Sequence, residues 1–118
     1  MWNNADNNTF NNCTFNAPAN TTSTTCVPFS VTGTASTLAS GPSGSNNILS
    51  GCTIFSGYYN TVFYGNSASP NTGNQVINCN IRDQYFYATY NFYQNGIIYR
   101  GNTLERLTRT TLSTYYGI

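Results

Sequence analysis

Four short segments of the chain share one pattern of apolar and small polar residues. In each of them an apolar residue is followed two positions later by Gly or Asn, then by Cys or Asn, a small polar residue and a second apolar residue. The segments are residues 10–15, 49–54, 76–81 and 99–104. Such a unit is too short to bury its own apolar side chains, so successive units have to stack on one another.

The residues between the units favour strands joined by tight turns. The chain has ten Tyr and seven Phe among 118 residues, and aromatic side chains are typical of strands because they fit a pleated surface. Its many Asn, Gly and Ser residues favour the turns between strands. No stretch has the period of an amphipathic helix, so the sequence predicts an all-β chain of many short strands.

Stacking of the units predicts a right-handed parallel β-helix of about four coils, forming one domain over residues 1–118. Equivalent residues of successive coils would then lie about 4.8 Å apart, as in any parallel sheet. The coils are expected near residues 6–45, 46–73, 74–95 and 96–118. Two apolar core columns are expected, one formed by Phe10, Leu49, Val76 and Tyr99 and the other by Phe15, Ile54, Ile81 and Leu104.

The first coil is longer than the others because it contains an insertion. Residues from about 16 to 45 are rich in Thr, Ser, Ala, Gly and Pro, which predicts a surface loop. Within this loop, Cys26–Val31 could return to the coil as a strand. At the other end of the chain, Tyr115–Ile118 repeats the start of the strand expected at Tyr58–Tyr59, so a further coil is expected to follow.

The four cysteines have two alternative interpretations. Cys13, Cys52 and Cys79 occupy the same place in their units as Asn102, so they could be small buried members of a Cys/Asn ladder, in which an inward Asn bonds the neighbouring coils. Alternatively, a disulfide between Cys13 and Cys26 would close the base of the inserted loop, and a less favoured one would join Cys52 to Cys79. Without His and without cysteines paired at zinc-site spacing, no metal site and no cofactor are predicted.

Charged residues are scarce and give no catalytic site. The chain has three carboxylates and no His, whereas glycoside hydrolysis generally needs a pair of carboxylates and a nucleophile needs an activating base. Alignment of the third and fourth units instead predicts two ion pairs between adjacent coils, Arg82 with Glu105 and Asp83 with Arg106.

The balance of charge and hydropathy also excludes two classes of partner. A net charge of +1 does not provide the basic surface that nucleic-acid binding requires. No apolar run approaches the length that crosses a bilayer. We therefore expect neither a nucleic-acid partner nor insertion into a membrane.

The tyrosines are the remaining candidates for binding. Strand alternation turns about half of them outward, and outward rings could hold the flat faces of sugars. They could equally stack on one another and stabilise the coils. The candidate ligand surface consists of Tyr58, Tyr59, Tyr85, Tyr87, Tyr115 and Tyr116.

The repeats and the Gly57-Tyr58-Tyr59 turn resemble the parallel β-helix repeats of pectate-lyase-like proteins. Residues 45–54 and 108–118 are similar to stretches of very large exported proteins of Bacteroidetes-type bacteria. The resemblance implies a β-helix in an exported, extracellular or cell-surface protein. It does not imply one activity, since such helices serve as enzymes, adhesins and scaffolds.

The sequence therefore predicts a structural or adhesive segment of an exported surface protein. Its expected partners are neighbouring coils of a longer chain, or copies of itself stacked end to end into a fibre. The alternative is a carbohydrate-binding β-helix that uses the tyrosines. A third possibility, a polysaccharide lyase or hydrolase, would have to depend on Asp83 or Glu105.

Overall fold

The computed structural model describes residues 1–35 and 38–118. Within these ranges all regular structure is β, and every strand pair is parallel. This confirms the predicted all-β class and the parallel pairing. Residues 36 and 37, which belong to the segment predicted as an inserted loop, lie outside the described residues.

Two four-stranded sheets contain the four repeated units. In each unit the strand before the Gly/Asn position joins the first sheet, and the strand after the Cys/Asn position joins the second. The first sheet consists of β1 (Thr9–Asn11), β4 (Ile48–Ser50), β8 (Gln75–Ile77) and β12 (Ile98–Arg100). The second consists of β2 (Thr14–Asn16), β5 (Thr53–Phe55), β9 (Asn80–Arg82) and β13 (Thr103–Glu105).

A third sheet contains the longer strands. Its order is β10-β6-β3, and a separate short pair joins β7 to β11. The third sheet is extended by single bridges, from Trp2 to Thr32 on one side and from Tyr116 to Tyr87 on the other. The strands are β3 (Phe29–Val31), β6 (Tyr59–Tyr64), β10 (Tyr87–Phe92), β7 (Asn71–Thr72) and β11 (Gln94–Asn95).

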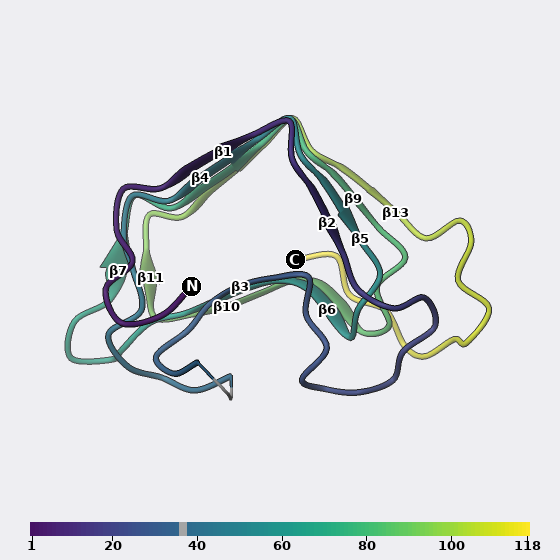
Figure 1. Ribbon diagram of the computed structural model, residues 1–118, viewed down its shortest axis with the longest axis horizontal. Coiled ribbons are helices and arrows are strands. Elements are labelled where there is room, and N and C mark those ends of the chain that lie inside the picture. The colour runs from purple at the N-terminus through teal and green to yellow at the C-terminus, as the bar shows by residue number, and fades with distance from the viewer. Residues whose placement is uncertain (36–37) are drawn as a thin grey trace.

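The three larger sheets surround the interior. Viewed along the stacking direction, strands of one sheet overlie each other, and the two four-stranded sheets meet at a sharp corner opposite the third sheet (Figure 1). The strand β3 lies inside the segment predicted as a loop, at residues that were expected to return as a strand. It pairs with β6 through the register Phe29↔Thr61 and Val31↔Phe63.

The two apolar columns occupy successive strands in register. Leu49 pairs with Phe10 and Val76, and Val76 also pairs with Tyr99. Ile54 pairs with Phe15 and Ile81, and Ile81 also pairs with Leu104. The inner members are Leu49, Val76, Ile54 and Ile81, each fully buried, whereas the outer members of both columns are partly exposed.

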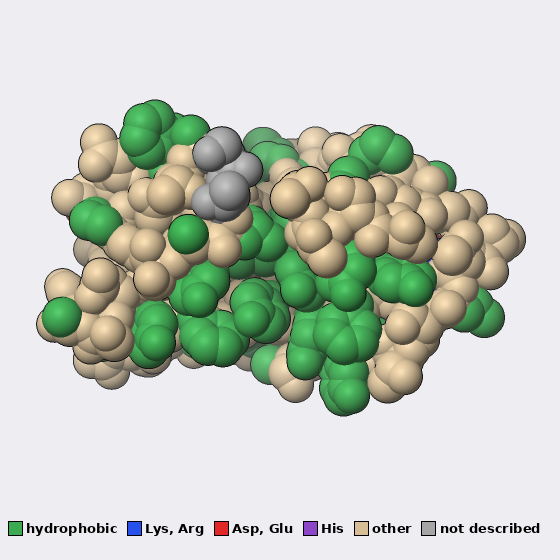
Figure 2. Space-filling model, turned by 90° about the horizontal axis from the view of Figure 1, so that it is seen from below, with side chains coloured by type: hydrophobic (Ala, Val, Ile, Leu, Met, Phe, Trp, Pro, Cys, Tyr) green, Lys and Arg blue, Asp and Glu red, His purple; other side chains and the backbone are tan. Residues whose placement is uncertain are grey.

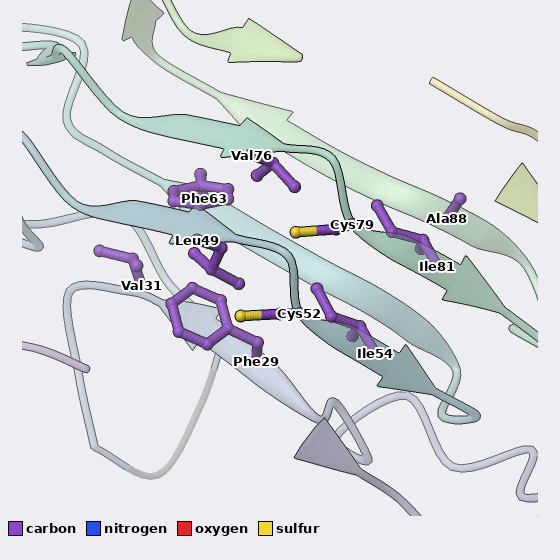
Figure 3. Close-up of a cluster of buried hydrophobic side chains, with 10 residues drawn as sticks. All are labelled: Phe29, Val31, Leu49, Cys52, Ile54, Phe63, Val76, Cys79, Ile81 and Ala88. Carbon is purple, nitrogen blue, oxygen red and sulfur yellow. The ribbon is translucent and has the colours of Figure 1, made fainter. Parts of the chain in front are cut away.

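The core lies between the sheets and is filled by side chains from all three. Leu49 and Val76 come from the first sheet, Ile54 and Ile81 from the second, and Phe63 from the third (Figure 3). Burial of these apolar side chains in a close-packed interior stabilises the fold.

The sharp corner between the first two sheets explains the Gly/Asn position of the repeat. At this position the backbone has a positive φ in all four units, between 52° and 66°. Gly adopts this conformation without strain, and Asn tolerates it better than other residues with a side chain. The corner residues are Asn12, Gly51, Asn78 and Gly101.

A column of asparagines stabilises the chain just before the first sheet. The Asn74 Oδ1 atom accepts a hydrogen bond from the Asn47 backbone N–H at 2.9 Å, and the Asn47 Oδ1 atom accepts one from the Asn8 N–H at 3.1 Å. Asn47 and Asn74 are fully buried. Asn102 plays a similar part at the sharp corner, where its side chain bonds Cys79 N–H and Val76 C=O. Side-chain amides thus pair backbone groups that the turns leave without a strand partner.

A glycine before β6 provides a test of this packing. Gly57 has a φ of 96°, and a Cβ atom there would lie 2.7 Å from Pro28 Cδ and 2.9 Å from the Cys26 carbonyl oxygen. We expect Gly57→Ala to lower the free energy of unfolding by about 3 kcal/mol, from overpacking and backbone strain together. Gly96→Ala is the matched control, since Gly96 has a φ of 73° but nothing within 4 Å, and it should cost about 1 kcal/mol. Equal losses in urea denaturation would contradict the packing argument.

Candidate functional site

A continuous aromatic network lies along the third sheet. Hydrophobic side chains gather on the face seen from below, where that sheet lies, and no Lys, Arg, Asp or Glu is visible among the described residues there (Figure 2). Each ring of the network contacts at least one other, with centroids no more than 6.4 Å apart. We call this network the aromatic surface, and it consists of Tyr58, Tyr59, Tyr64, Tyr85, Phe86, Tyr87, Tyr90, Phe92, Tyr93 and Tyr116.

Strand register brings these rings together. Tyr87 pairs with Tyr59 on one side and with Tyr116 on the other, so the three form a column. Tyr87 and Tyr116 stack with centroids 4.9 Å apart and planes at 20°. Tyr59 and Tyr90 stack at 4.9 Å and 13°. Pairs of this kind contribute about 0.5–1.5 kcal/mol beyond their burial.

The aromatic surface borders a hollow of about 340 Å³. The tyrosines of the hollow come from β6 and β10, and the opposite side comes from the loop that surrounds β3. Its lining consists of Tyr59, Tyr64, Tyr90, Thr24, Thr25 and Leu38. The hollow, which we call the tyrosine hollow, thus combines aromatic rings with hydroxyl groups and has no charged side chain in its lining.

Two phenols of the hollow, those of Tyr59 and Tyr90, have raised pKa values. Burial raises the pKa of Tyr59, and the neighbouring Tyr58, Tyr90 and Tyr87 raise it further. Burial also raises the pKa of Tyr90, with Tyr64 and Tyr87 adding to the effect. Within the described residues, no hydrogen-bond partner faces the hydroxyl of Tyr59, Tyr64 or Tyr90. These hydroxyls can therefore donate to, or accept from, a ligand.

The structure places the predicted ligand residues in two groups. Tyr58, Tyr59, Tyr85, Tyr87 and Tyr116 belong to the aromatic surface. Tyr115 does not, because its ring lies 5.7 Å from the Arg106 guanidinium on the C-terminal segment.

Sequence reasoning left Tyr64 and Tyr90 out of the candidate surface, although both line the tyrosine hollow. The sequence pattern that could have indicated them is the high aromatic content of the two longer strands, β6 and β10. That pattern does not show which rings lie side by side, because this depends on the register that pairs Tyr90 with Val62 and Phe92 with Tyr64.

Tyr99 has a different role from the surface tyrosines. Burial raises its pKa to about 12. Its hydroxyl donates a hydrogen bond of 2.9 Å to the Asn91 Oδ1 atom. This bond connects β12 to β10, so it supports the side of the third sheet that faces the interior.

The first predicted ion pair, between Arg82 and Glu105, does not form in the structure. The two residues are in register on β9 and β13, but no ion pair joins them among the described residues. Instead, the Arg82 guanidinium lies 5.0 Å from the ring centroid of Phe55, its register partner on β5. A guanidinium stacks well on an aromatic face, which explains the preference for this side.

The second predicted pair, between Asp83 and Arg106, is also replaced by other contacts. The Asp83 carboxylate accepts hydrogen bonds from Thr108 N–H at 2.8 Å, Thr108 Oγ1 at 2.7 Å and Arg109 N–H at 3.1 Å. Arg106 donates to the Ser113 carbonyl and lies over Tyr115. The chain turns back after β13, which directs the backbone N–H groups of residues 108 and 109 at Asp83.

Arg109 is the buried charge that sequence reasoning did not single out. It is only 7% exposed, and its guanidinium lies 4.9 Å from the ring centroid of Tyr85. The carbonyl groups that it bonds are those of Thr21, Gly57, Asp83 and Thr111. One side chain thus joins the inserted loop, the turn before β6 and the C-terminal segment, and it supports one end of the aromatic surface.

The disulfides that the sequence left as an alternative do not form, and all four cysteines are free thiols. Cys13 lies at the corner between β1 and β2, whereas the Cys26 carbonyl bonds Tyr58 N–H at the turn before β6, so the two occupy different corners of the fold. Cys52 and Cys79 are 1% and 2% exposed. Each donates its thiol to a backbone carbonyl, of Phe10 and Ile77 respectively.

The described residues contain no cluster of three or more metal-ligating side chains. No helix in the described part of the chain is long and apolar enough to cross a membrane.

The state of the cysteines can be measured directly. We expect alkylation by iodoacetamide to modify all four thiols after unfolding without reductant, as read by mass spectrometry. In the folded protein, Cys52 and Cys79 should react much more slowly than Cys13 and Cys26, because they are buried and burial raises the pKa of the Cys79 thiol. A fully unfolded, unreduced protein that leaves two thiols unmodified would establish a disulfide instead.

The lowered pKa of Asp83 predicts that the free energy of unfolding depends on pH. Burial by itself raises the pKa of Asp83, but the hydrogen bonds from Thr108 and Arg109 outweigh it and leave the pKa below its ordinary value. A carboxyl group with a lowered pKa in the folded state stabilises the fold fully at any pH above its pKa in the unfolded chain, which is about 4. This contribution is lost as the pH falls through the pKa of the folded state. Asp83→Asn suits the test, since Asn tolerates the φ of 59° at this position.

We expect Asp83→Asn to lower the free energy of unfolding by about 1 kcal/mol at pH 7. It should also reduce the loss of stability between pH 7 and pH 3, as measured by urea denaturation. Glu105→Gln is the control, because its carboxylate has no hydrogen-bond partner among the described residues. An Asp83→Asn variant with the pH profile of the unaltered protein would contradict the role of the charge.

No protein-family model, curated protein or solved structure matches this chain.

Proposed function

We propose that the chain is a segment of a right-handed parallel β-helix with a structural or adhesive role in an exported surface protein. Its ends would stack on neighbouring coils, either of a longer chain or of another copy. The observation that carries this proposal is the in-register pairing of four like units in each of two sheets. A repeat that pairs with itself in this way can be extended by one more unit at either edge.

The edge strand β1 has backbone groups available for such an extension. Asn8 C=O and Asn12 N–H both bond the neighbouring strand β4. Backbone groups alternate between the two sides of a strand, so the N–H groups of Thr9 and Asn11 face away from the sheet. Both side chains are exposed. The edge is therefore free to pair with another parallel strand.

The opposite edge, β12, is complementary to β1. Ile98 N–H and Arg100 C=O bond β8, which leaves the backbone groups of Tyr99 facing outward. Tyr99 and Phe10 belong to the same apolar column, so a strand like β1 placed on β12 would continue that column.

The apolar side chains at the two ends favour the same outcome. Phe10 and Phe15 at one end, and Tyr99 and Leu104 at the other, are only partly buried. Stacking would remove them from water and gain about 25 cal/mol for each Å² of apolar surface. The exposed β1 and β2 also contain no charged residue and no proline, which are the usual means of preventing edge-to-edge association.

The exported location rests on the resemblance and on composition. The repeats resemble those of large exported β-helical proteins, and the chain is rich in Asn and Thr with only 6% charged residues. A net charge of +1 gives little electrostatic repulsion between copies.

End-to-end stacking is tested by a substitution at the free edge. Asn11→Pro removes an outward N–H without deleting a bond to β4. We expect the unaltered protein to form concentration-dependent assemblies in sedimentation and filaments in electron microscopy, and Asn11→Pro to be shifted at least tenfold towards monomer.

The matched control is Asn11→Thr, which keeps the N–H group and suits a strand, and it should assemble like the unaltered protein. A monodisperse monomer at all concentrations for the unaltered chain would contradict stacking between copies. Thermal unfolding of each variant separates loss of assembly from loss of fold.

A further inference from the structure

We propose that the tyrosine hollow binds a neutral carbohydrate chain through its three tyrosine rings and its threonine hydroxyls. The hollow lies beside the third sheet and is lined by side chains of β6, β10 and the loop around β3. It does not include the free edges of β1 and β12. The site is thus independent of end-to-end stacking and would be present in a monomer as well as in an assembly.

The shape of the hollow fits a ring-shaped ligand. Its volume of about 340 Å³ lies at the lower end of the range of about 300–1,000 Å³ that small-molecule sites occupy. The Tyr59 and Tyr90 rings lie nearly parallel, with their planes at 13°. The Tyr64 ring stands at 85° to Tyr90, so the three rings form two differently oriented apolar walls.

The chemistry of the lining selects a ligand with both apolar and hydroxyl groups. The C–H face of a sugar ring packs on an aromatic ring, while its hydroxyls need hydrogen-bond partners. The hydroxyls of Tyr59, Tyr64, Tyr90 and Thr24 have no partner among the described residues, whereas Thr25 pairs with Ser23. A purely apolar ligand would bury these hydroxyls without partners, at a cost in free energy.

The absence of charge selects a neutral ligand. No charged side chain lines the hollow, and the described residues of the surrounding face show none (Figure 2). An acidic polysaccharide would lose hydration of its carboxylates and gain no arginine or bound cation in return. Because burial raises the pKa of Tyr59 and Tyr90, these two phenols also stay neutral.

The test is affinity electrophoresis in native gels that contain one polysaccharide each. The neutral probes are xyloglucan, galactomannan and a soluble β-glucan, and the acidic probe is polygalacturonate. We expect at least one neutral probe to retard the protein and polygalacturonate not to retard it. Retardation by none of the neutral probes, or equally by the acidic one, would overturn the proposal.

Two substitutions locate the site. Tyr90→Ala should weaken binding at least tenfold, because aromatic anchors dominate such surfaces, and Tyr115→Ala is the control, since Tyr115 is 40% exposed but lies outside the aromatic surface. Thr24→Val removes one free hydroxyl from an exposed loop residue and should weaken binding about threefold even if Tyr90→Ala fails to fold. Retardation that both variants retain would place binding elsewhere.

A second copy of the chain is the competing occupant of the hollow. Sedimentation of the Asn11→Pro variant at increasing concentration distinguishes a second copy from a carbohydrate, because end-to-end stacking is blocked in this variant. Dimers that persist in Asn11→Pro but dissociate in the double variant Asn11→Pro/Tyr90→Ala would overturn the carbohydrate proposal. Loss of assembly in Asn11→Pro with retained polysaccharide binding would support both proposals independently.

Discussion

The fold depends on hydrogen bonding between equivalent residues of successive parallel strands. Once Leu49 pairs with Val76 and Ile54 with Ile81, like side chains lie on one another and an apolar core forms from a chain with few large aliphatic residues. Each corner must then turn at the same place in every unit, which explains the positive φ values of Asn12 and its equivalents. A shift of the strand register by one residue would turn the core-facing side chains of that strand towards solvent.

The same pairing produces the surface that we propose to bind carbohydrate. On the third sheet, register collects rings that are far apart in the sequence, such as Tyr59, Tyr87 and Tyr116. Their mutual packing stabilises the sheet, and the loop near Thr24 leaves a concave site beside it. Structural packing of the tyrosines and the proposed carbohydrate binding are compatible, because the rings that pack on one another also line the hollow.

Two charged residues, Asp83 and Arg109, act as anchors where the repeat gives way to irregular chain. Asp83 and Arg109 together bond backbone groups of the C-terminal segment, and Arg109 reaches the inserted loop at Thr21. Buried charges are tolerated only with such partners. The ion pairs expected from strand register therefore do not form. Arg82 lies over the Phe55 ring, and the Asp83 carboxylate accepts hydrogen bonds from backbone N–H groups.

Sequence by itself determined the all-β class, the parallel pairing and the residues that share each column, because short units with the same internal pattern can bury their apolar positions only by stacking like on like. Tertiary structure alone decided the partners of Asp83, the free state of Cys13 and Cys26, and the membership of Tyr64 and Tyr90 in the hollow. These features depend on how irregular loops fold back over the sheets, and no local pattern encodes such long-range contacts. The sequence sets the small number of charged residues, whereas the packing of the loops determines where the tyrosine hollow lies.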